Sequence, residues 1–345
     1  MAPRDVLTTV VPPISPEDAG AAGLRHFGVT GIVRELSSER DRNFHVVAPD
    51  GQGYVLKFTN PAEPQVVTSF QTEAMLHLAE RDATLPVPRV VRTLEGEAQA
   101  TVQVDGCAMV LRLLTYLEGT PLHAAPASPG QMRALGTTLA RLDVALADFE
   151  HPGSRRDLLW DITRTPSIRD RLHYVEAGPR RRMVERFVAR FAEEVAPRLP
   201  ALRQQVIHND LNPHNAVVDP VGHEVVTGII DFGDALRAPL VNDLATALAY
   251  HVASGETPFG SMVAMTRAYN AVLPLTPEEV NLLPELVAAR LALTIGITNW
   301  RAAEYPENRA YILRNAERAF VGLDRLTGEE AATAHRLLHH ACQEG

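Results

Sequence analysis

The sequence predicts an α+β fold of two lobes, a β-rich N-lobe followed by a mainly helical C-lobe. First, the chain has 345 residues, which exceeds the roughly 100–200 residues of a typical single domain. Second, strand-like segments concentrate between residues 32 and 114. Third, from residue 128 onward, apolar residues recur at spacings of three and four, which is typical of helices. We therefore expect an N-lobe over residues 1–114, a hinge over 115–121 and a C-lobe over 122–345.

The N-lobe is expected to begin with a loose arm and a short helix, followed by an antiparallel sheet with one inserted helix. Pro64 is expected to begin that helix, because apolar residues Val67, Phe70, Ala74 and Leu78 then fall on one face. Turn-forming residues separate alternating segments that read as strands at 32–36, 44–48, 54–58, 89–94, 98–104 and 107–114.

The C-lobe begins with a helix that Ser128 caps and Pro129 opens. Short β segments are expected at 206–207, 215–218 and 225–230, and most candidate catalytic residues lie in and around them. Further helices are expected at 179–199, 242–253, 260–273, 277–305, 306–326 and 328–340.

Composition excludes several classes of protein. The chain is 46% hydrophobic and 22% charged, and its most apolar segment, residues 287–297, is interrupted by Arg290, so we expect no membrane span. A net charge of −9 argues against nucleic acid as a partner. Two cysteines do not make a disulfide framework, and residues 1–13 carry no leader pattern, so we expect a cytoplasmic protein. The oligomeric state is not predicted.

Two motifs carry the chemistry. His208, Asp210 and Asn215 form an H-x-D-x-x-x-x-N pattern, and Asp231 begins a D-F-G sequence sixteen positions later. Phosphoryl transfer needs a carboxylate beside the attacking hydroxyl and oxygen ligands for Mg²⁺, and these motifs supply both in the order that kinases use. Each motif alone is compatible with an ordinary turn. A zinc hydrolase using His208, Asp210 and His214 is an alternative that leaves the D-F-G sequence unexplained.

Lys57 is the single lysine of the chain, and every other residue in the Lys and Arg count is arginine. It lies near the end of an alternating strand, and Glu73 follows sixteen positions later on the predicted helix. Kinases hold nucleotide phosphates with a strand lysine that a helix glutamate positions. We therefore expect an ion pair between Lys57 and Glu73.

The chain resembles the aminoglycoside phosphotransferase and choline kinase superfamily, and within it the hydroxylysine kinase branch. The resemblance runs from about residue 24 to 326 and rests on residues 35–44, 112–119, 206–215, 228–234 and 241–245. It implies a bilobal protein-kinase-like fold that binds ATP or GTP with Mg²⁺ between its lobes. It also implies a small hydroxylated amine or amino acid as phosphoryl acceptor.

The resemblance also implies roles for individual residues. Asp210 would be the catalytic base and His208 would brace its loop, while Asn215 and Asp231 would hold Mg²⁺. Asp243 would hydrogen-bond the backbone of the catalytic loop. The residues expected at the nucleotide are Lys57, Glu73, Ser38, Asn43, Val55, Leu114, Thr115, Leu117 and Ile230.

Two departures from protein kinases bear on the acceptor. The turn at residues 37–43 lacks glycine, and only eleven residues separate Asp231 from Asp243, which leaves no room for a peptide-binding activation segment. A small-molecule acceptor is therefore favoured. Charged and aromatic side chains that could contact it are Asp234, Arg237, Trp300, Arg301 and Glu304.

The expected activity is transfer of a γ-phosphoryl group to a hydroxyl of a hydroxylysine-like amino acid. Alternative acceptors are aminoglycosides, homoserine, choline and ethanolamine. A catalytically silent nucleotide-binding module that regulates a partner is the alternative of another class. His335, His339 and His340 near the C-terminus are expected to be ordinary surface histidines rather than a metal site.

Overall fold

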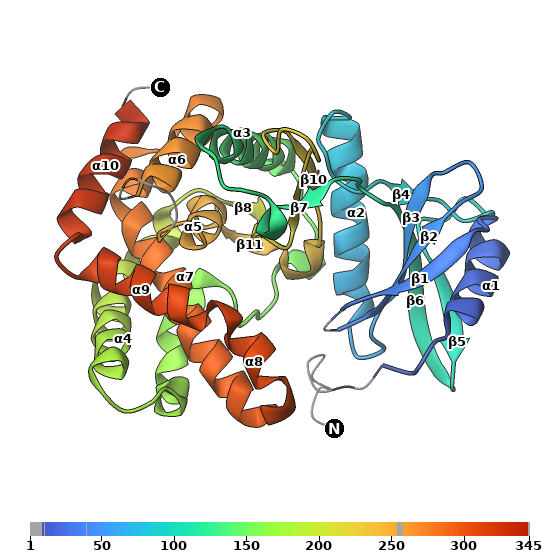
Figure 1. Ribbon diagram of the computed structural model, residues 1–345, viewed down its shortest axis with the longest axis horizontal. Coiled ribbons are helices and arrows are strands. Elements are labelled where there is room, and N and C mark those ends of the chain that lie inside the picture. The colour runs from blue at the N-terminus through green and yellow to red at the C-terminus, as the bar shows by residue number, and fades with distance from the viewer. Residues whose placement is uncertain (1–8, 10, 39, 254–256, 258, 344–345) are drawn as a thin grey trace. The chain divides into compact units, whose positions relative to one another are not determined.

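The computed structural model describes residues 9, 11–38, 40–253, 257 and 259–343 (Figure 1). The arm predicted at the N-terminus lies partly outside these residues. The chain forms two compact units, of which the first holds residues 1–119 with 151–154 and 227–230, and the second holds the rest. Strands dominate the first unit and helices the second, which confirms the predicted α+β class. The predicted hinge and lobe boundaries stay a prediction.

The first unit is built on one antiparallel sheet. Its order is β1-β2-β3-β6-β4, with β5 paired to β6. The segment predicted to be a strand at 89–94 contributes only two residues to it. The strands are β1 (Ile32–Leu36), β2 (Arg42–Val47), β3 (Gly53–Phe58), β4 (Val90–Val91), β5 (Ala100–Val104) and β6 (Cys107–Thr115).

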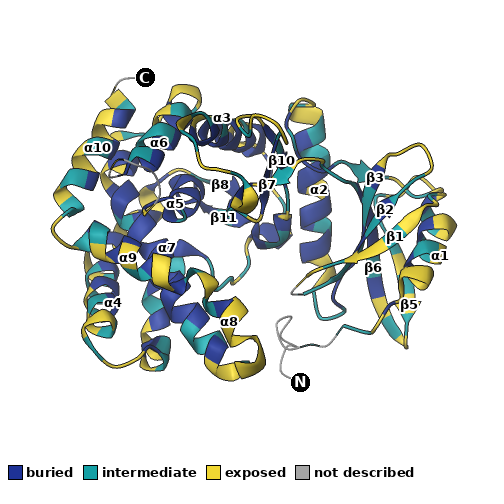
Figure 2. Ribbon diagram, in the orientation of Figure 1, coloured by how far each residue is buried: buried dark blue, intermediate teal, exposed yellow. Residues whose placement is uncertain are grey.

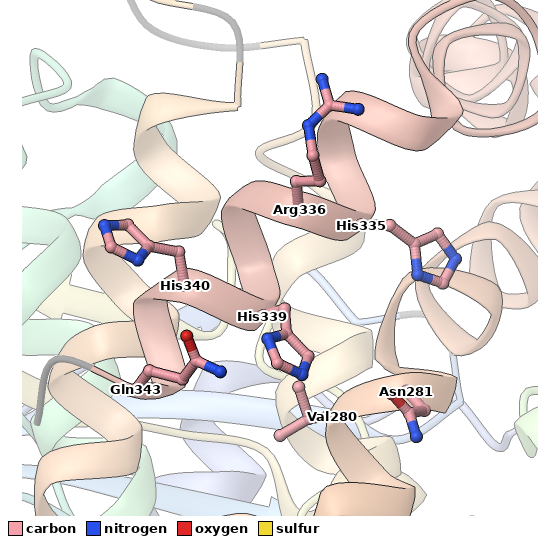
Figure 3. Close-up of a pocket in the computed structure, with 7 residues that line it drawn as sticks. All are labelled: Val280, Asn281, His335, Arg336, His339, His340 and Gln343. Atoms are coloured by element: carbon pink, nitrogen blue, oxygen red, sulfur yellow. The ribbon is translucent and has the colours of Figure 1, made fainter.

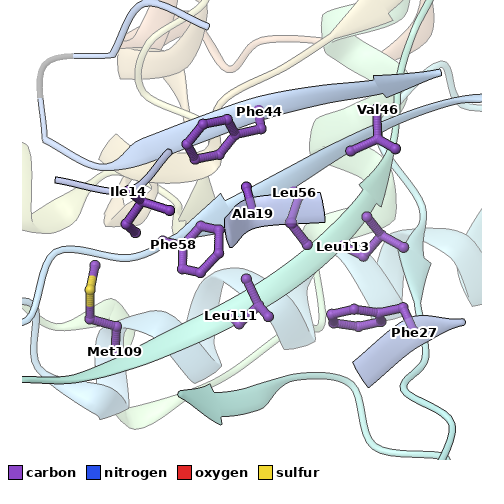
Figure 4. Close-up of a cluster of buried hydrophobic side chains, with 10 residues drawn as sticks. All are labelled: Ile14, Ala19, Phe27, Phe44, Val46, Leu56, Phe58, Met109, Leu111 and Leu113. Atoms are coloured by element: carbon purple, nitrogen blue, oxygen red, sulfur yellow. The ribbon is translucent and has the colours of Figure 1, made fainter. Parts of the chain in front are cut away.

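The two faces of this sheet have different chemistry, because successive side chains of a strand point to opposite faces. One face is apolar and packs against α1 (Pro16–Phe27), as Figure 4 shows. The other carries Lys57 and Arg112, which are register partners on β3 and β6. Arg112 donates to Gln71 of α2 (Gln65–Arg81) at 3.1 Å, so α2 covers the face that carries the lysine.

The second unit gathers its helices around short strands. Antiparallel pairing of β8 with β11 places Ile207 opposite Leu236, and β7 pairs with β9. The helices are α3 (Pro129–Leu146), α4 (Pro179–Arg190), α5 (Val241–Ala249), α6 (Gly260–Val272), α7 (Pro277–Glu304), α8 (Arg309–Ile312), α9 (Ala316–Thr327) and α10 (Ala331–Gln343). The strands are β7 (Thr120–Pro121), β8 (Gln204–Ile207), β9 (Ala216–Val218) and β11 (Leu236–Pro239), and β10 (Val226–Ile229) falls at the boundary of the two units.

Several features of this unit differ from the sequence expectation. The segment expected to form one helix over 306–326 is divided into a 3₁₀ turn, α8, a second 3₁₀ turn and α9. Strands β7 and β11 and a 3₁₀ segment at Ile162–Tyr174 were not predicted. The helix predicted over 179–199 ends as an α-helix at Arg190 and continues as π and 3₁₀ turns. Pro197 and Pro200 lack the N–H groups that would continue the α-helical ladder.

Helix α7 is the central helix of the second unit (Figure 2). A capping box between Thr276 and Glu279 fixes its first turn. Among the described residues it is the one helix long and apolar enough to cross a bilayer, but 89% of its most apolar window is buried. A helix that is apolar all round and enclosed by protein is a core helix.

Helices α3 and α6 approach closely at Gly136. A Cβ atom at this position would lie 2.2 Å from the backbone oxygen of Met265, so only glycine fits. A backbone oxygen on a packed helix cannot move aside as a flexible side chain does.

Gly136→Ala is therefore expected to lower the free energy of unfolding by about 1–3 kcal/mol, although alanine is the better helix former. Gly130→Ala on the same helix is the control, because its Cβ would meet only the flexible carboxylate of Glu224. Denaturant unfolding of the two variants measures the difference. Equal midpoints would contradict the close packing of α3 on α6.

Candidate active site

The pairing of β8 with β11 brings two loops to one end of the second unit. The loop after β8 holds Asp210, and the loop before β11 holds Asp231 and Asp234. A hydrogen bond of 3.2 Å from the Asn209 amide to the backbone oxygen of Asp234 ties the loops together. The fold thus joins the two motifs that the sequence analysis singled out.

Asp243, in the first turn of α5, holds the backbone of the first loop. Its carboxylate accepts hydrogen bonds from the backbone N–H groups of His208, at 2.9 Å, and Asn209, at 2.7 Å. Asn209 has a φ of +63°, in the left-handed region that a non-glycine residue rarely adopts. The contact is the one that the resemblance implies for Asp243, and it fixes the residues immediately before Asp210.

A second carboxyl group lies beneath Asp243. Asp143 of α3 is fully buried, and its Oδ2 accepts a hydrogen bond of 2.5 Å from the Tyr269 hydroxyl. Burial, followed by the negative charge of Asp243, raises the pKa of Asp143 well above its usual value. A protonated Asp143 can donate to Asp243, so the two carboxyl groups share one negative charge.

The Asp210 carboxylate has hydrogen-bond donors on both oxygens. Oδ1 accepts from the Arg290 guanidinium at 3.1 Å, and Oδ2 accepts from the side-chain amides of Asn215, at 2.7 Å, and Asn212, at 3.0 Å. Burial and the negative charge of Asp234 raise the pKa of Asp210 to about 7, against the opposing charge of Arg290. A carboxylate with a pKa near neutrality is suited to accept and release a proton.

His208 and Asp231 shape the two loops. The backbone N–H of Asp210 donates to His208 Nδ1 at 3.3 Å, and the His208 ring packs edge-on against Phe232. Asp231 has a φ of +64° and accepts from the backbone N–H of Gly233 at 3.0 Å. A Cβ on Gly233 would lie 2.7 Å from the Asp231 carboxylate, so a larger residue at this position would have to displace that side chain.

The oxygens near Asp210 fit a hard divalent cation. The side-chain amide N–H groups of Asn215 donate to Asp210, so the side-chain oxygen of Asn215 is left to bind a metal. Asp231 provides a carboxylate. Mg²⁺ takes one or two carboxylates and completes its shell with water and phosphate oxygens, so this sparse set is appropriate. No group of three His, Cys, Asp or Glu side chains suited to a metal is present in the described part of the chain. The zinc alternative fails there, because exposed His214 instead faces His123.

Lys57 has a different partner from the one expected. Its Nζ lies 2.8 Å from Asp41 Oδ2, and both side chains are more than four-fifths buried. Asp41 also accepts from the backbone N–H of Asn60 at 2.9 Å. Burial works against ionisation, but the charge of Lys57 and these hydrogen bonds hold the pKa of Asp41 below its usual value. The lysine is therefore positioned by the turn between β1 and β2.

Glu73 points elsewhere, with a side chain that is 55% exposed and 3.5 Å from His151. The predicted ion pair between Lys57 and Glu73 is therefore wrong. At about 100° per residue, Phe70 and Ala74 of α2 face the sheet, and Glu73 falls on the flank of the helix. Gln71, on the inner face of α2, binds Arg112 instead.

The other residues expected at the nucleotide lie in the first unit. Ser38 accepts from the backbone N–H of Asp41 at 3.2 Å, and Asn43 is the register partner of Lys57 on β2. Thr115 accepts from the backbone N–H of Arg89 at 2.9 Å. Val55 and Leu114 are register partners on β3 and β6, while Leu117 is half-buried and Ile230 follows β10 in the chain. Their contact with a nucleotide stays a prediction.

The residues expected at the acceptor are spread over the second unit. Asp234 is buried close enough to Asp210 to raise its pKa, whereas Arg237 pairs with Glu150 at 3.3 Å. The other three lie at the C-terminal end of α7: Trp300 under the Arg171 guanidinium, half-buried Arg301, and Glu304 within 3.4 Å of the Tyr174 hydroxyl.

Sequence reasoning missed three charged side chains that lie beside predicted site residues: Asp41 in the first unit, and Arg290 and Asp143 in the second. Arg290 and Asp143 each interrupt an apolar helix face, and a charge in such a place needs a buried partner. That signal was present in the sequence. Asp41 had no such signal, because it lies in an ordinary polar turn.

The histidines of α10 do not form a metal site. His335, His339 and His340 line a cavity of about 290 Å³ against the start of α7, and their rings point in different directions (Figure 3).

Asp41→Asn is expected to weaken binding of Mg²⁺·ATP about tenfold or more, because Lys57 loses the charged partner that orients it. Glu73→Gln is the matched control and is expected to change the dissociation constant less than threefold. Titration calorimetry measures both constants. A larger loss in the Glu73 variant would overturn the assignment of Asp41.

Asp143→Asn is expected to become more stable relative to the wild type as pH rises. In the unfolded chain Asp143 ionises near the usual aspartate pKa of 3.8, while the folded group retains its proton, so rising pH favours the unfolded wild type. Asparagine cannot ionise, which removes this loss of up to about 1.4 kcal/mol per pH unit. Urea unfolding between pH 5 and 8 measures the difference in stability between the two proteins. A constant difference would contradict a protonated Asp143.

The chain is similar to known kinases in sequence and in fold. The chain is 29% identical over 316 residues to hydroxylysine kinase of Danio rerio, which covers 88% of both chains. It is 32% identical over 240 residues to homoserine kinase of Methylobacillus glycogenes, which covers 69% of both. A microcompartment-associated aminopropanol kinase shares the fold, with a TM-score of 0.69, 16% identity and coverage of 92% of this chain and 97% of that one.

A family profile matches most of the same region. Residues 32–278 match the phosphotransferase enzyme family, and this range includes Lys57, Asp210, Asn215 and Asp231. The profile covers more than half of the chain, and the chain therefore belongs to the phosphotransferase enzyme family.

Proposed function

We propose that this phosphotransferase transfers the γ-phosphoryl group of ATP to the hydroxyl of a small amino acid, with hydroxylysine as the first candidate. Hydroxylysine kinases from four vertebrates match 85–88% of the chain at 28–29% identity. The observation that carries the proposal is Asp210, whose carboxylate is oriented by three side-chain donors at the end of β8.

Asp210 is the proposed catalytic base. The two amides on Oδ2 fix the plane of the carboxylate and leave a lone pair of Oδ1 for the acceptor hydroxyl. Asp210 would take the hydroxyl proton as the oxygen attacks the γ-phosphorus and ADP leaves. Asp243 accepts from the backbone N–H of His208, and His208 Nδ1 accepts from the backbone N–H of Asp210. These hydrogen bonds would keep the proposed base in place during the transfer.

Residues of each unit have a proposed role at the nucleotide. Lys57, held by Asp41, would bind phosphate oxygens as a compact charge. Asn215 and Asp231 would hold Mg²⁺. When bound, Mg²⁺ would neutralise the charge that develops on the phosphates. GTP stays an alternative donor, and the cytoplasmic location stays a prediction.

Homoserine is the second candidate acceptor, because homoserine kinases also match the chain. Homoserine and hydroxylysine share an α-amino acid group and an aliphatic hydroxyl. Choline, ethanolamine and aminoglycosides lack the carboxylate and are the more distant alternatives. A silent nucleotide-binding module would not need the three donors on Asp210 that this structure maintains.

The test is ADP release by purified protein with Mg²⁺ and ATP or GTP, over hydroxylysine, homoserine, ethanolamine, choline and an aminoglycoside. Turnover of hydroxylysine is expected, with kcat reduced about 10³-fold or more in Asp210→Asn. Arg180→Gln, which removes an exposed ion pair with Glu317, serves as a purification control. Nucleotide binding without turnover of any acceptor would favour the silent module, and unchanged kcat in Asp210→Asn would reject the assigned base.

A further inference from the structure

Arg290 is the least expected residue near the catalytic base. It lies in the middle of α7 and is 1% exposed. Its guanidinium contacts Asp210 Oδ1 at 3.1 Å, the backbone oxygen of Trp160 at 2.8 Å and the Tyr250 hydroxyl at 3.4 Å. It also lies over the Trp160 ring, with 5.0 Å between Cζ and the ring centroid. A full positive charge is therefore held next to the oxygen proposed to receive the acceptor's proton.

This placement costs free energy, which the negative charges of Asp210 and Asp234 partly offset. Desolvating a guanidinium is expensive unless its donors are satisfied, and Arg290 Nε is a buried donor without a hydrogen-bond partner among the described residues. Arg290 is one of three side-chain donors to Asp210, and the other two, Asn212 and Asn215, both bind Oδ2. The guanidinium thus keeps donor capacity for a group that the protein itself does not supply.

The position of Arg290 limits what that group is. Asp210 Oδ1 and the Arg290 nitrogen are 3.1 Å apart. A hydroxyl that is hydrogen-bonded to Asp210 and a second group that is hydrogen-bonded to Arg290 would therefore lie at most about 9 Å from each other. Both groups can therefore belong to one small molecule. Like charge excludes an ammonium from the guanidinium, whereas a carboxylate matches its planar set of donors.

The two arginines that the sequence analysis named as possible acceptor contacts, Arg237 and Arg301, are less well placed for this role. Arg237 is paired with Glu150 at 3.3 Å. Arg301 lies eleven residues beyond Arg290 on α7, which is about 16 Å along the helix axis. Among these three arginines, Arg290 is the one in contact with Asp210.

We propose that Arg290 binds the carboxylate of the acceptor and makes this enzyme selective for hydroxy amino acids over amino alcohols. The proposal rests on the proposed function and names the substrate class of the same site. In the acceptor complex the guanidinium is shared between Asp210 and the substrate carboxylate, while Trp160 keeps it in plane.

The experiment uses two acceptors that differ only in the carboxylate, hydroxylysine and 1,5-diamino-2-pentanol. Steady-state ADP release is measured for the wild type, Arg290→Gln and Arg290→Lys. The wild type is expected to prefer hydroxylysine about 100-fold in kcat/KM, and Arg290→Gln to reduce this preference to a few-fold, mainly by raising KM for hydroxylysine. Arg290→Lys is expected to restore part of it. Arg198→Gln is the matched control, since Arg198 pairs with Glu278 at the exposed start of α7.

Each other outcome is decisive. An equal loss of kcat for both acceptors in Arg290→Gln would overturn the proposal, because Arg290 would then act only by positioning Asp210. If Arg290→Gln is inactive but folded by circular dichroism, calorimetric binding of L-lysine, which has the carboxylate and no hydroxyl, decides. Unchanged lysine affinity would overturn the proposal, and a loss of about tenfold or more would support it.

The failure of this proposal is distinguishable from failure of the proposed function. If the wild type phosphorylates the diamino alcohol as efficiently as hydroxylysine, the enzyme is a kinase but has no carboxylate site, and only the proposal for Arg290 fails. A wild type that turns over neither these acceptors nor homoserine contradicts the proposed function itself.

Discussion

The buried carboxylate of Asp243 accepts hydrogen bonds from two backbone N–H groups, and these bonds determine where the loop that carries Asp210 lies. Asp243 binds the N–H groups of His208 and Asn209, and this allows Asn209 to hold its left-handed φ. Asp210 leaves the loop directly after that residue, so its direction follows from the same contact. Because Asp143 and Tyr269 lie beneath Asp243, helices α3, α5 and α6 all contribute to the position of a single side chain. The helical packing of the second unit is thus coupled to the chemistry.

The charges around Asp210 are balanced by few cations. Asp231, Asp234 and Asp210 influence one another, and their repulsion is opposed within the described unit by Arg290. A divalent cation and a nucleotide brought to such a site would change this balance in opposite directions. In the absence of a cation or nucleotide, the positive charge of buried Arg290 lowers the repulsion among these carboxylates. This explains how the acidic cluster is accommodated in the folded chain.

Much of this arrangement was predictable from the sequence. The features that could not be predicted depend on contacts between residues that are far apart in the chain. Asp210 and Asn215 are five positions apart in one loop, so their contact follows from local spacing. The α+β class and most helices followed from periodicity, whereas β11 forms only because β8 is present to pair with it. Lys57 was identified by its rarity, but its partner depended on the phase of α2 and on the fold of a polar turn. Arg290 is 80 positions from Asp210, and no local pattern connects them.

Helix α7 runs without interruption from Pro277 to Glu304 and carries Arg290 near its centre and Trp300 near its end. The buried central turns are constrained on all sides, while the last turns are partly exposed. A substitution in the last turns of this helix is therefore expected to leave Arg290 in place. One continuous helix thus joins a position where a change of side chain must displace packed neighbours to a position where a new side chain can extend into solvent.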